Sequence, residues 1–156
     1  AAARAENQFR GLHERVTVLA NTPAGPRLIS DVTASASESY RPASVNRLVS
    51  MVVRAARRVR DEAVFEPAGE RVWNDLRDRL GALLLGLLRA GALRGGTPAE
   101  AFSVRCDRST MTQNDIDNGR TVLDIQFTPT VPVEQIRVVL ALDEGGQVQL
   151  TQAGAA

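Results

Sequence analysis

Two long central stretches place apolar residues at helical spacing. In the first, apolar residues recur every three or four positions from Val45 onward, and Ser44 is expected to be the N-cap. Pro67 ends this stretch, because proline cannot continue a helix. The second helix is expected from about Glu70 to Leu93, and its second half is apolar on nearly all sides. Such a helix needs cover on more than one side, from its own domain or from another subunit.

The C-terminal half alternates apolar and polar residues, as strands do. Residues 102–106 form a short apolar run that predicts a buried strand. In residues 123–128, Leu123 and Ile125 alternate with polar residues, and residues 135–142 show a similar alternation. We expect these two strands to pair antiparallel, with one face of the sheet in contact with water. Residues 147–151 show a shorter alternation after a glycine-rich turn.

The N-terminal part predicts a loose β-hairpin. Two short β-type segments, residues 15–20 and 27–35, flank turn residues at Gly25 and Pro26. The whole pattern predicts an α+β fold: a mostly antiparallel sheet of about four strands, two long helices packed on one face, and terminal arms. We therefore divide the chain into an N-terminal lead-in with the hairpin (1–43), an inner domain (44–142) and a C-terminal arm (143–156).

Composition excludes several classes of protein. The 156 residues suit one domain, and 19 basic against 18 acidic residues give a net charge of only +1. That charge provides no strong field for nucleic acid or an anionic membrane. The longest strongly apolar run, Leu80–Leu88, is too short to cross a bilayer, which takes about 20 residues. All 19 basic residues are arginine, so neither a P-loop lysine nor a Schiff-base lysine is available.

Candidate catalytic and metal sites fail on residue type or register. The single Cys106 and the single His13 cannot form a disulfide or a four-ligand zinc site, and Cys106 lies in an apolar stretch typical of a buried thiol. A calcium loop starting at Asp115 would need Gly where Arg120 stands and Glu where Gln126 stands. We therefore expect no enzyme activity, no cofactor and no metal, and interpret residues 114–119 as a turn.

Four short motifs, in a characteristic order and spacing, resemble the C-terminal region of contractile tail sheath proteins over residues 45–142. Two departures are Ala68, where the family usually has Asn, and Leu88, where many members have an aromatic residue. The motifs are Val64-Phe65-Glu66-Pro67 followed by Trp73, then Gly91-Ala92-Leu93, then Ala101-Phe102-Ser103-Val104-Arg105-Cys106-Asp107, and finally Asp115-Ile116-Asp117-Asn118-Gly119.

The resemblance implies the conserved inner domain of a structural sheath subunit. Such subunits build contractile phage tails, phage-tail-like bacteriocins or extracellular contractile injection systems. Full sheath proteins also carry an N-terminal arm and outer domains without counterpart here, so we expect either a fragment or a reduced member. The implied partners are identical subunits in stacked, hexameric rings, the inner tail tube protein and the baseplate, with neither nucleic acid nor membrane. The implied location is the cytoplasm during assembly, then a virion or a released particle.

The family is known for exchange of terminal arms between subunits, and the resemblance implies such an arm here. Val148 and Leu150 are expected to pair with another subunit rather than fold back, against a strand carrying Ile136, Val138 and Leu140. A shared backbone ladder can persist while the rings move. The alternative is an ordinary hairpin about a turn at residues 144–146.

Three arginines of the first helix, Arg47, Arg54 and Arg58, lie opposite its apolar stripe. By the resemblance they are candidates for a contact with the inner tube, and the alternative is a solvated stripe. A competing function is a small nucleic-acid-binding domain that uses the Arg-rich helix 44–65. The low net charge and the few aromatics, one Trp, one Tyr and four Phe, argue against it.

Overall fold

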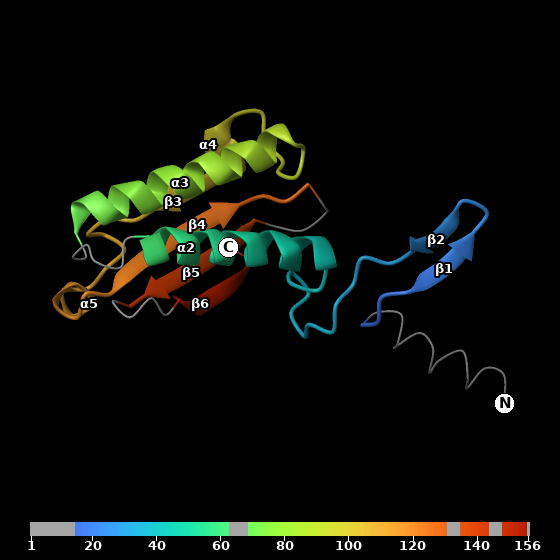
Figure 1. The fold of residues 1–156 in the computed structure, drawn as a ribbon, viewed down its shortest axis with the longest axis horizontal. Helices are drawn as coiled ribbons and strands as arrows, with labels where there is room; N and C mark the ends of the chain where they lie inside the picture. Colours follow the sequence, from blue (N-terminus) through green and yellow to red (C-terminus); the bar gives the residue numbers. More distant parts are fainter. Residues whose placement is uncertain (1–14, 63–68, 131–134, 144–147, 156) are drawn as a thin grey trace. The chain divides into compact units, whose positions relative to one another are not determined.

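The computed structural model describes residues 15–62, 69–130, 135–143 and 148–155 (Figure 1). The chain divides into two compact units, Ala1–Arg47 and Leu48–Ala156, and the boundary falls within a helix. The first unit contributes a two-stranded sheet, and the second contributes a four-stranded sheet. Among the described residues, no helix is both long and apolar enough to cross a membrane.

A tight hairpin forms the described part of the first unit. Strands β1 (Leu19–Thr22) and β2 (Gly25–Leu28) pair antiparallel, with Leu19 opposite Leu28. Gly25 has φ of 100°, a conformation open to glycine but strained for other residues. Both leucines of the pair are exposed, at 68% and 62%. The hairpin thus shows an apolar pair to solvent in the structure of the single chain.

Helix α2 (Ala43–Glu62) begins one residue before Ser44, so the prediction of Ser44 as N-cap is wrong. Ser44 lies inside the first turn, and its backbone N–H donates to the Asp31 carboxylate at 3.0 Å. Its hydroxyl donates to the same carboxylate. The cap is therefore supplied from 13 positions upstream, a distance over which no local capping pattern operates. The predicted helix end at Pro67 lies outside the described residues.

Helix α3 (Glu70–Arg89) begins where the sequence predicts but ends before Leu93. Gly91 adopts φ of 76°, and its N–H donates to the carbonyl of Leu88 at 3.0 Å. This left-handed glycine directly follows the C-cap residue Ala90, which explains the early end. Leu93 is instead buried and forms an isolated β-bridge with Pro129. The short helix α4 (Pro98–Ala101) follows, with proline at its first turn.

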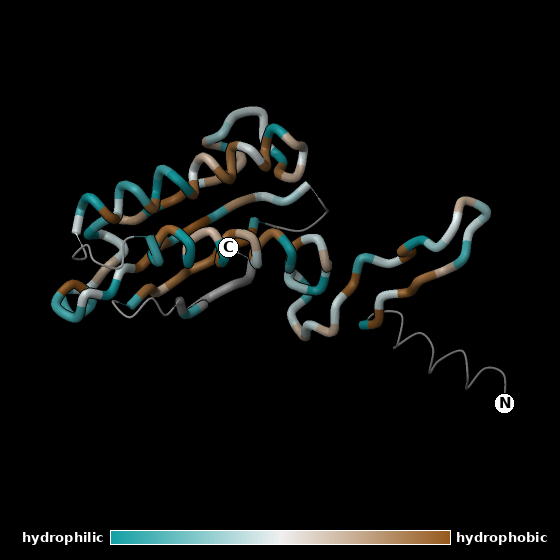
Figure 2. The backbone as a smooth tube through the Cα atoms, in the orientation of Figure 1, coloured by the Kyte–Doolittle hydropathy of each residue, from teal (hydrophilic) through white to brown (hydrophobic). Residues whose placement is uncertain are grey.

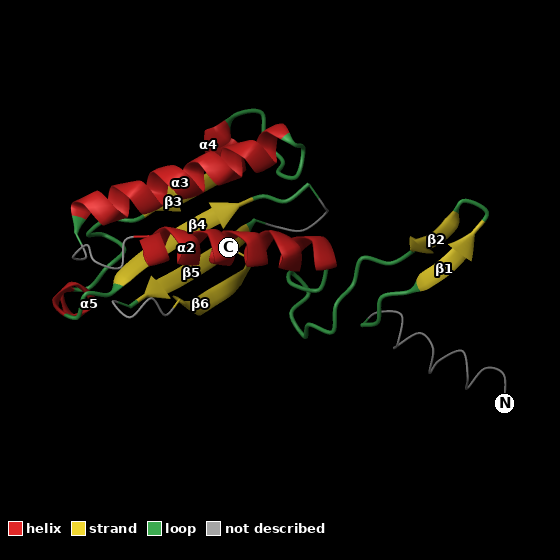
Figure 3. Cartoon of the chain, in the orientation of Figure 1, coloured by secondary structure: helices red, strands yellow, loops and turns green. Residues whose placement is uncertain are grey.

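The second unit contains one antiparallel sheet in the order β3-β4-β5-β6. Helices α2 and α3 cover one face of it, with α3 beside β3 and α2 in front of β5 (Figures 1 and 3). The predicted α+β fold class is confirmed, as is the antiparallel pairing of β4 with β5. The four strands are β3 (Phe102–Arg105), β4 (Thr121–Phe127), β5 (Ile136–Leu142) and β6 (Val148–Ala155).

The core of the second unit lies between this sheet and the two helices. Alternate positions of β4 and β5 are fully buried, which follows from the period of two. Figure 2 shows the apolar residues concentrated along the same strands and along the inner sides of the helices. The buried apolar residues of α2 after the unit boundary, α3, β4 and β5 are Val49, Val52, Ala56, Val59, Val72, Trp73, Leu76, Leu80, Leu84, Leu123, Ile125, Phe127, Ile136, Val138, Leu140 and Leu142.

A one-turn helix, α5 (Gln113–Asp117), occupies the segment that the sequence predicts as a polar loop. Thr112 and Asp115 form a reciprocal capping box: the Asp115 N–H donates to the Thr112 hydroxyl at 3.2 Å, and the Thr112 N–H donates to the Asp115 carboxylate at 2.9 Å. Gly119, with φ of 62°, follows the helix. The carboxylate considered for calcium therefore satisfies backbone donors.

Strand β6 pairs antiparallel with β5 of the same chain. The prediction that residues 147–151 do not fold back is thus wrong for the single chain, which adopts the alternative hairpin. Closing a short connection costs little entropy, and β6 satisfies the edge groups of β5. β6 also extends to Ala155, beyond the predicted strand, with a register shift between Val139 and Leu140. Pairing with another copy in an assembly stays a prediction.

Candidate functional site

The three arginines predicted to face a tube are exposed on α2. Arg47 belongs to the first unit, and Arg54 and Arg58 belong to the second. Arg54 donates from Nε to the backbone oxygen of Ser50 at 3.2 Å. Among the described residues, neither Arg54 nor Arg58 forms an ion pair. Their charges are therefore available to a partner. Within the second unit, Met51 shares a helix face with Arg54 and Arg58, because residues 51, 54 and 58 follow the three-or-four spacing of one face.

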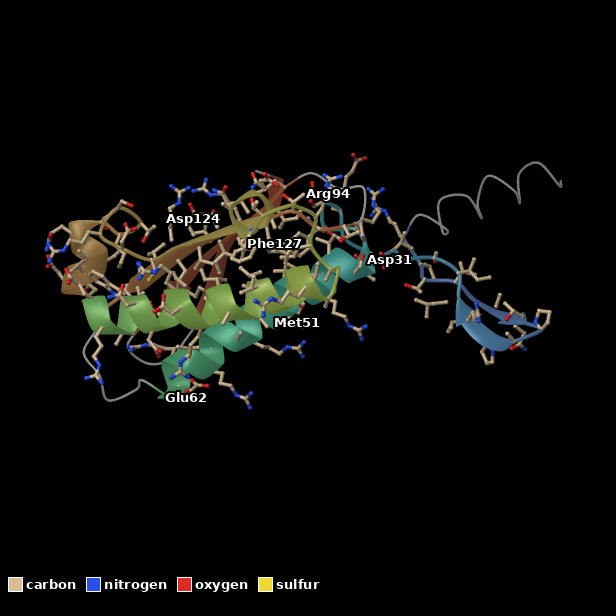
Figure 4. All side chains as sticks on the ribbon, turned by 90° about the horizontal axis from the view of Figure 1, so that it is seen from above. Asp31, Met51, Glu62, Arg94, Asp124 and Phe127 are labelled. Carbon is tan, nitrogen blue, oxygen red and sulfur yellow. The ribbon has the colours of Figure 1, made fainter. Side chains whose placement is uncertain are left out.

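A groove of about 590 Å³ separates the outer faces of α2 and α3. Its floor contains Met51, Ala55 and Leu83, which are half-buried, and its rim carries arginines. In Figure 4, Met51 is labelled on α2, on the helix layer. The arginine pattern of the first helix predicted two of the rim residues, Arg54 and Arg58. It did not predict the groove, because a groove depends on how two helices pack. The lining residues are Met51, Arg54, Ala55, Arg58, Val59, Arg79 and Leu83.

Arg79 joins the two helices at one end of this groove. Its Nη1 donates to the Glu62 carboxylate of α2, and its Nε donates to Asp75 at 2.9 Å, one turn earlier on α3. The hydrogen bonds that Arg79 donates to Glu62 and then to Asp75 raise the pKa of Arg79 above its usual range. Two carboxylates balance this guanidinium, so among the described residues the uncompensated positive charge of the groove comes from Arg54 and Arg58.

Apolar residues in the second half of α3 are only partly covered. Leu80 and Leu84 are buried, at 0% and 1% exposure, whereas Leu83 and Leu87 are half-buried. The sequence predicts that this half-helix needs cover on more than one side. Its own domain covers one side, and Leu83 contributes part of the remaining apolar surface to the groove.

Arg60 is a buried arginine that the sequence analysis did not single out. It is 1% exposed, and its Nε donates to the backbone oxygen of Asp143 at 3.4 Å, after β5. The Asp143 carboxylate accepts a further hydrogen bond from Arg120 at 3.1 Å. Arg60 follows the buried Ala56 by four positions, so its place on the buried stripe was the available signal. It joins the C-terminal half of α2 to the end of the sheet.

The sheet face away from the helices carries a compact charged cluster. Asp124 on β4 is only 7% exposed, although its position predicts a wet side chain. Arg137 on β5 donates to it through Nε and Nη2, each at 3.0 Å, and Arg105 Nη2 on β3 lies 3.6 Å away. Figure 4 shows Asp124 on the side of the sheet opposite the helices. Arginines on the two neighbouring strands cover this carboxylate. The residue pattern of a single strand does not reveal such cross-strand pairing.

The predicted strand-exchange residues divide into two groups. Ile136, Val138 and Leu140 are fully buried at 0% exposure, so their side chains belong to the core. In the backbone register, Val148 lies opposite Leu142 and Leu150 opposite Leu140. The groups of β5 that a second copy could use are therefore main-chain donors and acceptors rather than these side chains.

Cys106 is buried at 2% exposure, and His13 lies outside the described residues. Burial, with a smaller contribution from the Asp107 charge, raises the pKa of the Cys106 thiol to about 12. The protonated thiol is a poor nucleophile at neutral pH. Within residues 15–62, 69–130, 135–143 and 148–155, no cluster of three or more His, Cys, Asp or Glu side chains could hold a metal ion.

Comparison with known proteins gives no match to a family model and none to a curated protein. Solved structures do match. A chain of the anti-feeding prophage (AFP) baseplate is 24% identical, with a TM-score of 0.68, over 82% of this chain. A chain of the PVC sheath complex, an extracellular contractile injection system in the contracted state, is 25% identical, with a TM-score of 0.66, over 80%. A chain of the contracted AFP helical sheath is 25% identical, with a TM-score of 0.64, over 83%.

This chain spans 37% of the length of each of the three matched chains. The match nevertheless covers at least 80% of this chain, so it includes most of the elements described above. The resemblance drawn from the sequence motifs is thereby confirmed by the fold.

Proposed function

We propose that this chain, which shares its fold with contractile sheath proteins, acts as a structural subunit of a contractile sheath. The observation that carries the proposal is the match to chains of the PVC and AFP sheaths in their contracted states. The role is mechanical rather than enzymatic, which agrees with the buried, protonated Cys106. The location that follows is the cytoplasm during assembly, then a virion or a released contractile particle.

The proposed partners are identical subunits in stacked hexameric rings, together with a baseplate. Neighbouring subunits would be joined by exchange of β6: the strand of one copy would leave its own β5 and pair with β5 of the next. The same register, with Val148 opposite Leu142 and Leu150 opposite Leu140, could form within one copy or between two copies. Exchange would leave Ile136, Val138 and Leu140 buried under the helices, so it costs little in core packing.

The inner tube is the third proposed partner, contacted through Arg54 and Arg58 and, in the first unit, Arg47. Exposed ion pairs are worth only about 0–1 kcal/mol each, so each subunit would bind the tube weakly. Repetition around each ring would hold sheath and tube together without preventing sliding during contraction. This contact requires acidic side chains on the tube.

The full-length protein that carries this chain tests the proposal when it is produced together with the tube protein of its particle and examined by electron microscopy. We expect hollow helical tubes and, with the tube protein present, sheathed tubes. A protein that stays monodisperse under assembly conditions would contradict the proposal. Salt-sensitive retention of duplex or single-stranded DNA on a filter would instead favour the nucleic-acid function.

Charge reversal tests the tube contact. The variant Arg54→Glu with Arg58→Glu is expected to assemble into sheath but to release the tube at lower salt than the wild type. Arg94→Glu with Arg108→Glu, at two exposed arginines outside α2, makes the same change of charge, is the matched control and should bind the tube normally. Unchanged salt sensitivity of the double variant would rule out this surface as the tube contact.

A further inference from the structure

The groove between α2 and α3 combines two features that a purely ionic contact does not need. Arginines line its rim, yet its floor exposes parts of Met51, Ala55 and Leu83. An arginine stripe that only contacts water would not require a partly exposed apolar depression beside it. Partly exposed apolar residues rimmed by charge are typical of a surface that receives a side chain from a partner.

The geometry of the rim sets the spacing of the ligand. Arg54 and Arg58 are four positions apart on one helix, so they are separated by about 6 Å along its axis. Met51 precedes Arg54 by almost one turn, and Leu83 approaches from the other helix. An apolar side chain placed on this floor therefore has two guanidinium groups within one helical turn of it.

We propose that this groove binds an acidic protein segment, burying one apolar side chain against Met51 and Leu83 while flanking carboxylates pair with Arg54 and Arg58. The inference rests on the proposed function, in which that segment belongs to the tube. It adds that recognition depends on an apolar anchor as well as on charge. The carboxylates supply orientation and salt sensitivity, and the anchor supplies most of the specificity.

The charge of the groove distinguishes three possible occupants: an acidic protein segment, a second copy of this chain and a nucleic acid. The charged residues lining the groove are Arg54, Arg58 and Arg79, and only Arg79 is balanced by carboxylates among the described residues. A second copy docked through the same face would bring these arginines against their own counterparts, which is unfavourable. A nucleic acid would satisfy the arginines but would leave the apolar floor without a partner. An acidic segment with an apolar residue fits both features.

Binding of labelled peptides to the full chain, followed by fluorescence anisotropy, tests this inference. The probe peptide carries one leucine between two pairs of glutamates. In the first control peptide alanine replaces the leucine, and in the second glutamine replaces each glutamate. We expect the alanine peptide to bind about tenfold more weakly, from the apolar area that it fails to bury. The glutamine peptide should lose most of its binding, and binding of the probe should weaken as salt rises.

Two variants of the chain complete a double-mutant cycle. Leu83→Ala and Met51→Ala each remove part of the floor and are expected to bring binding of the leucine peptide close to that of the alanine peptide. Binding of the alanine peptide should change little. Circular dichroism confirms that each variant is folded, and because the two residues lie on different helices, a folding defect in one leaves the other to test.

Equal affinity for the leucine and alanine peptides would overturn the inference. So would a leucine-peptide affinity that neither variant alters, or tighter binding of an oligothymidylate than of the probe. Failure here is distinguishable from failure of the proposed function. A protein that assembles into sheath but does not discriminate the peptides contradicts only the anchor groove. A chain that discriminates them while its full-length protein does not assemble contradicts only the sheath function.

Discussion

Asp124 on β4 and Arg137 on β5 form a two-point ion pair across neighbouring strands, with both N–H donors 3.0 Å from the carboxylate oxygens. In the register, Arg137 lies opposite Gln126, so the pair runs diagonally across the ladder. Such diagonal neighbours are within reach of a long arginine side chain. The pair joins β4 to β5 on the sheet face that the helices do not cover.

Replacing Asp124 with alanine should destabilise the second unit. The change leaves Arg137 and Arg105 side by side without their common carboxylate, so the free energy of unfolding should fall by about 1–2 kcal/mol. Urea denaturation followed by circular dichroism measures it. Asp61→Ala, at an exposed carboxylate on α2, is the control. Equal stability of the Asp124 variant and wild type would show that the pair does not hold the sheet.

Replacing the buried Arg60 should lower the free energy of unfolding, although most charged residues lie on the surface and contribute little to it. Arg60→Ala removes a side chain that is 1% exposed and its hydrogen bond to Asp143, so we expect a loss of about 2 kcal/mol or more. Arg60→Met keeps most of the aliphatic stem and should lose less. The matched control is Arg58→Ala, two positions earlier and exposed, for which we expect a change within about 0.5 kcal/mol. Equal effects at both positions would contradict the burial of Arg60.

The loop carboxylate of Asp31 should stabilise the start of α2. Asp31→Ala removes the acceptor of the Ser44 N–H and hydroxyl, and loss of a helix cap costs about 1 kcal/mol. Hydrogen exchange monitored by NMR should show faster exchange at the Ser44 amide. Ser44→Ala keeps the backbone hydrogen bond and should exchange more slowly than Asp31→Ala. Identical exchange in wild type and Asp31→Ala would disprove this cap.

Cys106 makes stability depend on pH at the alkaline end. Burial raises its pKa from the ordinary value of 9.0 to about 12 in the folded state. The unfolded state therefore loses this proton first as the pH rises, so the contribution is complete below about pH 9 and is lost between pH 9 and pH 12. Relative to Cys106→Ala, the wild type should lose stability between pH 8 and pH 10.5 in urea denaturation. A constant difference across that range would contradict the shift.

The periodicity of apolar residues predicted those helices and strands that bury one face against the core. The alternation of Leu123 and Ile125 identified β4, and the recurrence from Val45 onward identified α2, because burial on one face imposes that period. Features that depend on a second segment were missed. The cap from Asp31, the cover over Asp124 and the groove between Met51 and Leu83 each join residues from different elements.

Local patterns also fell short in two places. The capping box of Thr112 and Asp115 is visible in the sequence, but a one-turn helix has too few residues for a period. Strand β6 was predicted to leave its own sheet because the family exchanges terminal arms. A single chain has no neighbour to accept the strand, so its own β5 pairs with it instead. Pairing of β6 with another copy in an assembly stays a prediction.

Two single-cysteine variants give the most direct test that this molecule links identical copies through a shared β-ladder. Val139 and Gln152 are opposite each other in the β5–β6 register, so Val139→Cys and Gln152→Cys are placed for a disulfide. Each is made in the full-length protein with Cys106 and any other native cysteine replaced by alanine, and the two are mixed, assembled and oxidised. A disulfide between the variants can then form only if β6 of one copy pairs with β5 of another. Our account predicts covalent dimers in assembled material and none in monomers; assembled sheath without such dimers would contradict it.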